Sequence, residues 1–253
     1  MIIYIIIIII ILGIMKLCNN NAPELQYYLT NKYVTNTIFI NPNYDVKYIN
    51  NIVVIDNIIN IDIFSKITNI FKDKLFDSKN AFIRKGTGKS MLKLHQDPDY
   101  LTLLQFYYSN QLLNLLSYTL GKPIQRVTSA DMNACSLLIY TKEGDYINWH
   151  KDYSHYYGDR YVVLLTIVNE NDTKTDLSAN VFKYKYNDEI HEIKMKPNSM
   201  VIFKGSEIEH MATPIKNNET RILLSMTFCD ICLQKNNIFV DIYEKVKNYF
   251  LYQ

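Results

Sequence analysis

The chain has 253 residues, a formal net charge of +2 and four cysteines. A chain of this length can bury a sizeable core without disulfides, and so small a net charge gives no overall reason to expect nucleic acid or acidic partners. Isoleucine, asparagine, tyrosine and lysine are all abundant. Single aromatic or charged residues therefore carry little weight unless they form a pattern.

An apolar run, Ile2 to Met15, opens the chain and is closed by Lys16. A helix over this run rises only about 21 Å, which is short of a hydrocarbon core of about 30 Å. A signal peptide is the competing interpretation, but no basic segment precedes the run and no clear small-residue cleavage site follows it. We therefore predict a retained hydrophobic anchor or signal-anchor at residues 1–20 and a membrane location. The side of the membrane, endomembrane lumen or cytosol, stays open.

Residues 21–125 form a predicted N-terminal α/β support region. The lead over residues 19–46 is predicted to be irregular or to form short strands. A strand is then predicted over Ile52–Asp56, a helix over Asp62–Phe76 and a longer helix over Tyr100–Leu120. The longer helix should end at Gly121-Lys122-Pro123, because glycine adopts the left-handed conformation of a helix C-cap and proline cannot continue a helix.

Two motifs in this region are similar to functional sites but fail a physical test. Pro98 follows His95-Gln96-Asp97 directly, so Asp97 is predicted to be a helix N-cap with Pro98 at the first helical position, not a metal ligand. The run Gly86-Thr87-Gly88-Lys89-Ser90 lacks the first glycine of a phosphate-binding loop, since Ile83 stands there. We predict that this run is a basic, glycine-containing loop near the mouth of an active site.

Strands dominate residues 126–232, and a closing helix is predicted over Ile238–Phe250 within residues 233–253. Short apolar or alternating segments predict strands at Asp131–Tyr140, Tyr146–His150, Tyr161–Asn169, Asn180–Lys185, Glu189–Met195, Met200–Phe203 and Arg221–Phe228. This order predicts an α+β fold in which helices brace one sheet of a jelly roll.

A His-x-Asp pair stands at the end of the second of these strands. Side chains alternate in an extended strand, so Asn148, His150 and Asp152 should face one way and Ile147 and Lys151 the other. One metal ion can then take both His150 and Asp152.

A lone histidine, His210, follows the short apolar strand Met200–Phe203. Two neutral imidazoles and one carboxylate are the ligand set of non-haem Fe(II), which leaves adjacent positions open for a 2-oxo acid and O2. His150, Asp152 and His210 are therefore the predicted metal ligands and catalytic residues. Arg221 opens the last strand, and Ser225 and Thr227 share its face.

Taken in order, these residues resemble a known family. The pattern of Tyr140, Gly144, His150, Asp152, Ala179-Asn180-Val181-Phe182, Pro197, Phe203, His210, Pro214 and Arg221 resembles the Fe(II)/2-oxoglutarate-dependent dioxygenases, most closely their prolyl 4-hydroxylase-like branch. The resemblance covers residues 126–230 strongly and the region from Ile52 more weakly. It implies a double-stranded β-helix (jelly-roll) core and an oxidoreductase that hydroxylates a side chain of a protein or peptide, prolyl by preference.

The same resemblance implies how the cosubstrate is bound. Arg221 would pair with the distal carboxylate of 2-oxoglutarate, since a planar guanidinium meets a carboxylate with two charge-assisted hydrogen bonds. Tyr140 and Ser225 would be the hydroxyl partners. The implied cofactors are Fe(II), 2-oxoglutarate and O2, with ascorbate as an accessory reductant. Oxidative decarboxylation of 2-oxoglutarate would yield succinate and CO2.

Several positions depart from the family pattern. Collagen-type prolyl hydroxylases usually carry lysine in place of Arg221, so the match is nearer to the oxygen-sensing prolyl hydroxylases. AlkB-like demethylases place a second arginine after Thr-Phe, where this chain has Cys229. Leu223 stands where many relatives have serine, which leaves the hydroxyl partner open. Two alternatives remain: an AlkB-like oxidative demethylase with nucleic acid as its partner, and a non-catalytic jelly-roll binding module.

Two further features lie close to the predicted site. Cys229 and Cys232 form a lone Cys-x-x-Cys, which argues against a zinc ribbon or a thioredoxin-like site. Two small apolar residues at a strand edge are the favoured interpretation, and a disulfide is the other. Residues 153–157 follow Asp152 as a polar, aromatic loop and are candidates for a lid over the substrate.

Overall fold

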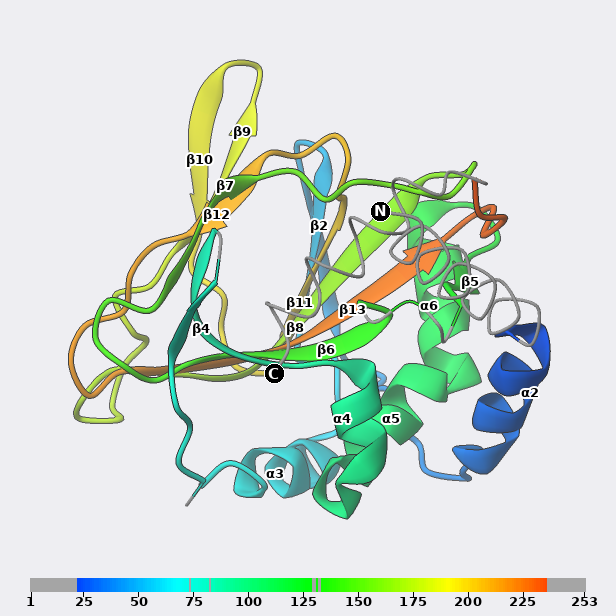
Figure 1. Ribbon diagram of the computed structural model, residues 1–253, viewed down its shortest axis with the longest axis horizontal. Coiled ribbons are helices and arrows are strands. Elements are labelled where there is room, and N and C mark those ends of the chain that lie inside the picture. The colour runs from blue at the N-terminus through cyan, green and yellow to red at the C-terminus, as the bar shows by residue number, and fades with distance from the viewer. Residues whose placement is uncertain (1–21, 73, 82, 129–130, 132, 236–253) are drawn as a thin grey trace, which may run out of the picture.

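The computed structural model describes residues 22–235 apart from 73, 82, 129–130 and 132 (Figure 1). The predicted anchor at residues 1–20 and the predicted closing helix at 238–250 lie outside these residues. Within the described part of the chain, no helix is both long enough and apolar enough to cross a bilayer. Membrane association thus stays a prediction from the sequence.

Helices precede most of the strands along the described chain. The helical segments are α2 (Ala22–Lys32), α3 (Ile61–Asn69), α4 (Met91–Gln96), the 3-10 turn η1 (Pro98–Tyr100), α5 (Leu101–Tyr108) and α6 (Asn110–Leu120). The strands are β1 (Asp45–Ile49), β2 (Ile52–Asp56), β3 (Lys79–Ala81), β4 (Arg84–Lys89), β5 (Gln125–Arg126), β6 (Cys135–Tyr140), β7 (Tyr146–His150), β8 (Arg160–Glu170), β9 (Phe182–Tyr186), β10 (Glu189–Ile193), β11 (Ser199–Lys204), β12 (His210–Ala212) and β13 (Thr220–Cys229).

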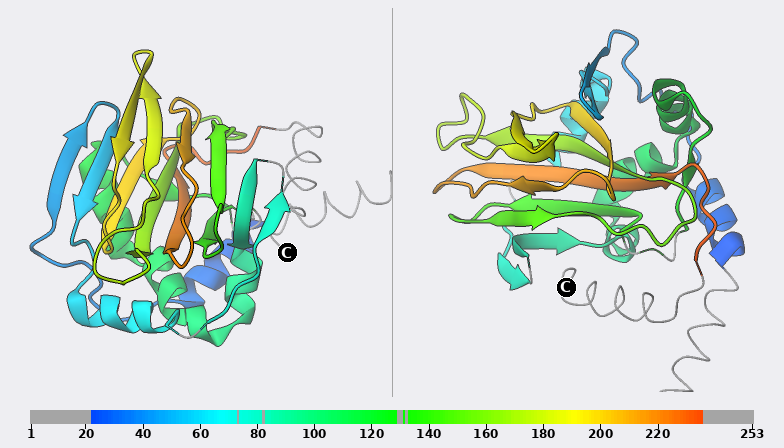
Figure 2. Two further views of the ribbon diagram at one scale, coloured as in Figure 1. Left: turned by 90° about the vertical axis from the view of Figure 1, so that its left-hand side faces the viewer. Right: turned by 90° about the horizontal axis from the view of Figure 1, so that it is seen from above.

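The strands form one sheet that curls over to make two facing walls (Figure 2). Their order is β1-β2-β11-β8-β13-β6-β4-β7-β12-β9-β10. Strand β4 belongs to both walls, because Thr87–Lys89 pair with β6 while Arg84 and Lys85 pair with β7. In this spatial order, the larger wall consists of β1, β2, β11, β8, β13 and β6. The smaller wall consists of β7, β12, β9 and β10. This antiparallel arrangement confirms the predicted jelly-roll core.

Two hydrophobic cores lie on opposite faces of the larger wall. One core joins this wall to the helices, which cover its outer face (Figure 2). The other core fills the space between the two walls. Strand β13 contributes to both: Ile222, Leu224, Met226 and Phe228 pack under the helices, and Leu223 packs between the walls. Burial on both faces explains the nearly continuous apolar sequence of this strand.

Most predicted core strands are present with small shifts at their ends. The strands predicted over Ile52–Asp56 and Tyr146–His150 are confirmed as β2 and β7 with the same bounds. Strands β1, β3, β4, β5 and β12 are additional. Four of them come from residues 45–126 and join the same sheet as the later strands.

The single helix predicted over Tyr100–Leu120 is wrong, because the chain forms α5 and α6 with a break at Ser109. Ser109 is extended, and its side chain accepts a hydrogen bond from the N–H of Leu112, which caps α6. The guanidinium of Arg126 donates to the carbonyl oxygens of Tyr107 and Ser109 at 2.9 and 2.8 Å. These two carbonyls therefore find donors without a continuous helix. Gly121 is confirmed as the left-handed C-cap, and Asp97 as the N-cap before Pro98.

Two other helix predictions also need correction. The helix predicted over Asp62–Phe76 ends at Asn69, and the turn that follows lets both Phe71 and Phe76 reach the core. The predicted irregular lead contains helix α2. Its end is fixed by Tyr33, which stacks on Tyr108 at 5.3 Å and hydrogen-bonds Nδ1 of His95 at 2.7 Å. Packing against distant residues thus decides the conformation of this segment.

The glycine-containing segment predicted to be a loop is strand β4. Its residues alternate between buried and half-buried, as expected for a strand between two neighbours. Gly86 has a φ of 149°, and a Cβ there would lie 3.0 Å from the carbonyl oxygen of Ile139 and 3.2 Å from the Tyr140 ring. Glycine therefore allows β4 to approach β6 closely at the turn between the two walls.

Candidate metal centre

The three predicted metal ligands converge beside the smaller wall. His150 ends β7, Asp152 follows two residues later, and His210 begins β12. The two histidines are register partners across these antiparallel strands, and their ring centroids are 4.2 Å apart. One ligand atom from each of the three residues lies within 4.8 Å of the others. This spacing is compatible with one shared metal ion.

A β-bulge in β7 changes which residues face the metal centre. His150 pairs with His210 but Ile147 pairs with Ala212, so three steps on β7 match two steps on β12. The prediction that Ile147 faces away is therefore wrong, since Ile147 lines the cavity that holds the ligands. Lys151, which follows the end of β7, borders that cavity but is exposed. Asn148, predicted to face inward, is exposed. Bulges of this kind re-aim side chains near functional sites.

A backbone carbonyl two residues earlier orients each imidazole. Nδ1 of His150 lies 2.7 Å from the carbonyl oxygen of Asn148, and Nδ1 of His210 lies 3.1 Å from that of Ile208. A carbonyl oxygen only accepts hydrogen bonds, so both Nδ1 atoms carry a proton and each Nε2 can present its lone pair. Metal-binding histidines are commonly held by such bonds.

The turn after β11 holds Asp152. The N–H of Asp152 donates to the carbonyl oxygen of Gly205 at 2.9 Å. A Cβ on Gly205 would lie only 2.8 Å from Cβ of Asp152 and 2.9 Å from Cγ2 of Val162. Because Gly205 has no side chain, Asp152 can occupy this space. The sequence around Gly205 does not predict this role.

The charges of the site suit a divalent cation. Burial, with a smaller contribution from the imidazole of His150, lowers the pKa of His210 to about 4, although Asp152 opposes the shift. His210 is therefore neutral at pH 7, with Nε2 3.8 Å from Oδ2 of Asp152. Two imidazole nitrogens and one carboxylate oxygen fit Fe(II).

Arg221 lies in the same cavity and is only 1% exposed. Its guanidinium donates to Sδ of Met195 at 3.2 Å and lies 5.8 Å from the ring centroid of Tyr140, its register partner in β6. Burial lowers the pKa of Arg221 to about 10, so the side chain stays charged at pH 7. A cation held against a thioether and a ring is well placed to receive a carboxylate.

The cavity between the walls has a volume of about 290 Å³ and joins the metal ligands to Arg221. As the alternation predicted, Arg221, Leu223, Ser225 and Thr227 all line it. Tyr140 borders the guanidinium, whereas Ser225 is four residues further along β13, or about 13 Å in an extended strand. A larger and more open cavity of about 690 Å³, between α3 and β8, contains none of the predicted ligands.

Two buried arginines in this cavity were not predicted. Arg160 begins β8, and its guanidinium donates to the carbonyl oxygen of Tyr153 at 2.9 Å and to Oγ1 of Thr227 at 3.3 Å. Alternation could have revealed it, because Val162 and Leu164 also line the cavity. Arg84 comes from β4, which the sequence did not identify as a strand.

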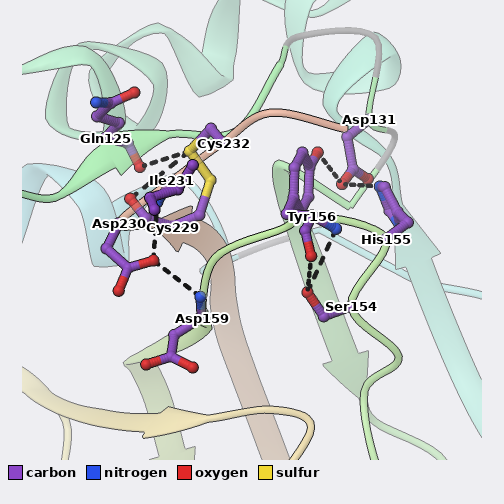
Figure 3. The surroundings of a disulfide bond; sticks show 10 residues. All are labelled: Gln125, Asp131, Ser154, His155, Tyr156, Asp159, Cys229, Asp230, Ile231 and Cys232. Carbon is purple, nitrogen blue, oxygen red and sulfur yellow. Dashed lines mark hydrogen bonds and ion pairs between the residues drawn. A yellow bond between two sulfur atoms is a disulfide. The ribbon is translucent and has the colours of Figure 1, made fainter. Parts of the chain in front are cut away.

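Cys229, the last residue of β13, forms a disulfide with Cys232 (Figure 3). The favoured interpretation as two separate apolar residues is therefore wrong. The turn between them brings their Cα atoms to 5.3 Å, a typical separation for bridged cysteines. Sequence spacing alone does not show whether a Cys-x-x-Cys closes into such a turn.

Comparison with known proteins places this geometry in a structural context. No protein-family model matches the chain, and no curated protein sequence matches it. Solved structures do match. A prolyl hydroxylase from Trichoplax adhaerens, in complex with a hypoxia inducible factor peptide fragment, is 12% identical with a TM-score of 0.52, over 83% of this chain and 91% of that one.

Two more structures show the same likeness. A prolyl-4-hydroxylase from Pseudomonas putida has 12% identity and a TM-score of 0.50, over 74% of this chain and 94% of that one. The non-heme α-ketoglutarate-dependent epimerase SnoN, from nogalamycin biosynthesis, has 10% identity and a TM-score of 0.52, over 72% and 78%. The fold is that of the 2-oxoglutarate-dependent Fe(II) oxygenases. The predicted resemblance is thus confirmed at the level of the fold.

Proposed function

We propose that this chain is an Fe(II)- and 2-oxoglutarate-dependent dioxygenase that hydroxylates a side chain of a protein or peptide, prolyl by preference. One observation carries the proposal: His150, Asp152 and His210 converge in a jelly roll whose cavity also contains the buried Arg221. A structural role for the same residues would not need a buried guanidinium in that cavity. Bound Fe(II) would supply O2 activation coupled to oxidative decarboxylation of 2-oxoglutarate to succinate and CO2.

The protein's own groups have separate roles. Nε2 of His150, Nε2 of His210 and the carboxylate of Asp152 would hold the metal, and the carbonyl bonds to both Nδ1 atoms fix the two rings in the binding orientation. Arg221 would bind the distal carboxylate of 2-oxoglutarate. Tyr140, beside the guanidinium, would donate a hydroxyl hydrogen bond to the same carboxylate. Ser225, about 13 Å further along β13, lies too far from Arg221 to share that carboxylate.

The walls of the cavity limit the access of water. Five of its lining residues are apolar and large: Leu138, Val162, Leu164, Phe182 and Leu223. An apolar wall strengthens the electrostatic attraction between a guanidinium and a carboxylate, because little water is present to screen it. The apolar wall also lets O2 enter easily, because O2 is small and apolar. A polar solute would lose its hydration on entering the same space.

The likeness to two prolyl hydroxylases supports the preference for a prolyl side chain. One of them was solved with a peptide bound, which supports a protein or peptide as the partner. The likeness to an epimerase shows that the same fold also serves other reactions, so the substrate must be tested directly.

Anaerobic reconstitution of the full chain tests the reaction. The protein is loaded with Fe(II) and 2-oxoglutarate, O2 is added, and succinate is measured. We expect His150→Ala and Asp152→Ala to lose succinate formation because each removes a metal ligand. His191→Ala is the matched control, since His191 lies in β10 outside the cavity, and it should retain activity. Equal turnover in all of these proteins would exclude the proposed chemistry.

A substrate screen separates the alternatives. Proline-containing peptides and methylated oligonucleotides are incubated with the active protein, and the products are weighed by mass spectrometry. Gain of one oxygen atom on a peptide supports the hydroxylase. Loss of a methyl group from an oligonucleotide would favour an AlkB-like demethylase, and tight metal binding without succinate would favour a non-catalytic module.

A further inference from the structure

Residues 153–158 directly follow the metal ligand Asp152 and begin at one end of the cavity. Tyr153 lines the cavity, and its carbonyl oxygen accepts a hydrogen bond from Arg160. Arg160 also donates to Thr227, at the far end of β13 from Arg221. The separation of Thr227 and Arg221 is six residues, or about 20 Å in an extended strand. The segment therefore lies at the end of the cavity opposite the proposed 2-oxoglutarate carboxylate.

A buried carboxylate holds the inner side of this segment (Figure 3). Oδ2 of Asp131 accepts a hydrogen bond of 3.0 Å from the hydroxyl of Tyr156 and lies 3.4 Å from Nε2 of His155. The N–H of Asn133, another residue of the cavity wall, donates to Oδ1 of Asp131 at 2.8 Å. Asp131 thus ties the segment to Asn133, which lines the same cavity as Asp152.

Residues 231–235 hold the outer side by main-chain hydrogen bonds. The N–H of Tyr157 donates to the carbonyl oxygen of Leu233 at 2.9 Å, and that of Gly158 to Ile231 at 3.1 Å. The N–H of Lys235 donates back to the carbonyl oxygen of His155 at 2.7 Å. The two stretches are therefore paired in the manner of antiparallel strands.

The Cys229–Cys232 disulfide closes the turn from which residues 231–235 begin. Inside the turn, Oδ1 of Asp230 accepts hydrogen bonds of 2.8 Å from the N–H groups of Asp159 and Ile231. A side chain on Gly158 would collide with Asp230 and Ile231, so turn and segment are in direct contact.

We propose that residues 153–158 form the substrate side of the cavity and that the Cys229–Cys232 disulfide is a reducible positioning element for them. The inference rests on the proposed oxygenase function for its effect on activity, but not for its effect on the conformation of the segment. Opening the turn frees residues 231–235, and the three main-chain bonds to the segment then lose their fixed partner.

The reduction needs a dithiol as the electron donor. Cys229 is fully buried and Cys232 is half-buried, so the reductant's thiolate attacks Sγ of Cys232 and Cys229 leaves as a thiolate. The mixed disulfide joins the first sulfur of the reductant to Sγ of Cys232. The reductant's second thiolate then attacks that first sulfur and releases the thiolate of Cys232. Two electrons pass to the protein, both thiolates take protons, and the reductant leaves as a cyclic disulfide.

Reduction should change substrate binding more than metal or cosubstrate binding. Asp152 is held independently by Gly205, and Arg221 lies at the other end of β13. We expect the KM for a peptide found in the substrate screen to rise. We also expect the amount of hydroxylated peptide formed per succinate to fall. The KM for 2-oxoglutarate and the affinity for Co(II) should change by less than about twofold.

Hydrogen–deuterium exchange on the full chain tests the positioning role without any need for activity. Dithiothreitol should speed exchange at least about tenfold in residues 153–158 and 231–235, with residues 135–140 unchanged. The double variant Cys229→Ser, Cys232→Ser should match the reduced protein without reductant. Cys135→Ala, which removes the buried free thiol of β6, should respond like the wild type. Where the double variant does not fold, reversible reduction of the wild type provides the comparison.

Three results would overturn the proposal. The first is alkylation of both Cys229 and Cys232 in the air-exposed protein, which would mean that the disulfide does not form. The second is unchanged exchange in residues 153–158 after reduction. The third is faster exchange with an unchanged KM for the peptide, which would mean that residues 153–158 do not contribute to substrate binding. Absence of succinate in both redox states counts against the proposed function instead, and the exchange result still decides the positioning role.

Discussion

Replacing Arg221 by methionine should stabilise the ligand-free protein and abolish its stabilisation by 2-oxoglutarate. A pKa lowered by burial from 12.5 to about 10 means that the charge costs the folded state roughly 3 kcal/mol at pH 7, because the unfolded chain holds this proton more tightly. Loss of the contacts with Tyr140 and Met195 offsets about 1 kcal/mol of this. A net gain of about 1–3 kcal/mol corresponds to a Tm higher by about 2–12 °C.

Binding of 2-oxoglutarate should favour the wild type instead, because only the wild type gains stability from it. At a hundred times its Kd, a ligand stabilises the folded state by about 2.7 kcal/mol. Wild-type protein with Mn(II) should gain this stability from 2-oxoglutarate, and Arg221→Met should gain none. Thermal unfolding of both proteins, each with Mn(II) and with or without 2-oxoglutarate, measures the four values needed.

Arg126→Met is the matched control, since burial also lowers the pKa of Arg126. Arg126 differs because it donates to the carbonyl oxygens of Tyr107 and Ser109. Methionine would leave both carbonyls without this donor, so the control should lose about 2 kcal/mol or more and keep its response to 2-oxoglutarate. Equal destabilisation of the two variants, or a normal 2-oxoglutarate response in Arg221→Met, would refute the assignment of Arg221 as a carboxylate site.

Two further predictions concern the neighbours of the ligands. Gly205→Ala should weaken Co(II) binding about 10–100-fold, because the added methyl group collides with Asp152. Gly121→Ala, a glycine of positive φ at the end of α6, should lower stability without changing Co(II) binding, and equal effects in a spectroscopic titration would contradict this role of Gly205. Burial raises the pKa of Asp131, but His155 and Arg160 outweigh it and lower the pKa to about 2. The stability that the charge provides, roughly 2 kcal/mol, is present above the unfolded pKa of 3.8 and is lost as the pH falls toward 2. Urea unfolding should show the stability advantage over Asp131→Asn shrinking across this range, and a constant difference would count against it.

Local spacing was enough to predict the parts of the site that depend on one strand. Arg221, Leu223, Ser225 and Thr227 line the cavity because an extended strand repeats every two residues. His150 and Asp152 are likewise two residues apart. The family pattern added His210, which no local rule connects to them.

Contacts between distant residues account for most of what the sequence did not predict. Arg126 stabilises the break between α5 and α6 from outside both helices. Gly205 matters because Asp152 and Val162 approach it in space. Local spacing cannot reveal either effect, since each depends on which elements the fold brings together.

The bulge in β7 involves both local spacing and contacts between strands. It changes which side chains face the cavity, and it places a carbonyl oxygen that hydrogen-bonds a metal ligand. Asn148 is exposed, yet its carbonyl oxygen holds Nδ1 of His150. Deleting Asn148 should make the pairing with β12 regular and keep Ile147 and His150 on the cavity side. The carbonyl two residues before His150 is then that of Ile147, and regular pairing directs it to a neighbouring strand instead of to Nδ1. We expect Co(II) affinity to fall about 10–100-fold. Asn148→Ala keeps the backbone carbonyl and should bind Co(II) like the wild type. If the deletion binds Co(II) as well as the substitution does, the bulge does not orient His150.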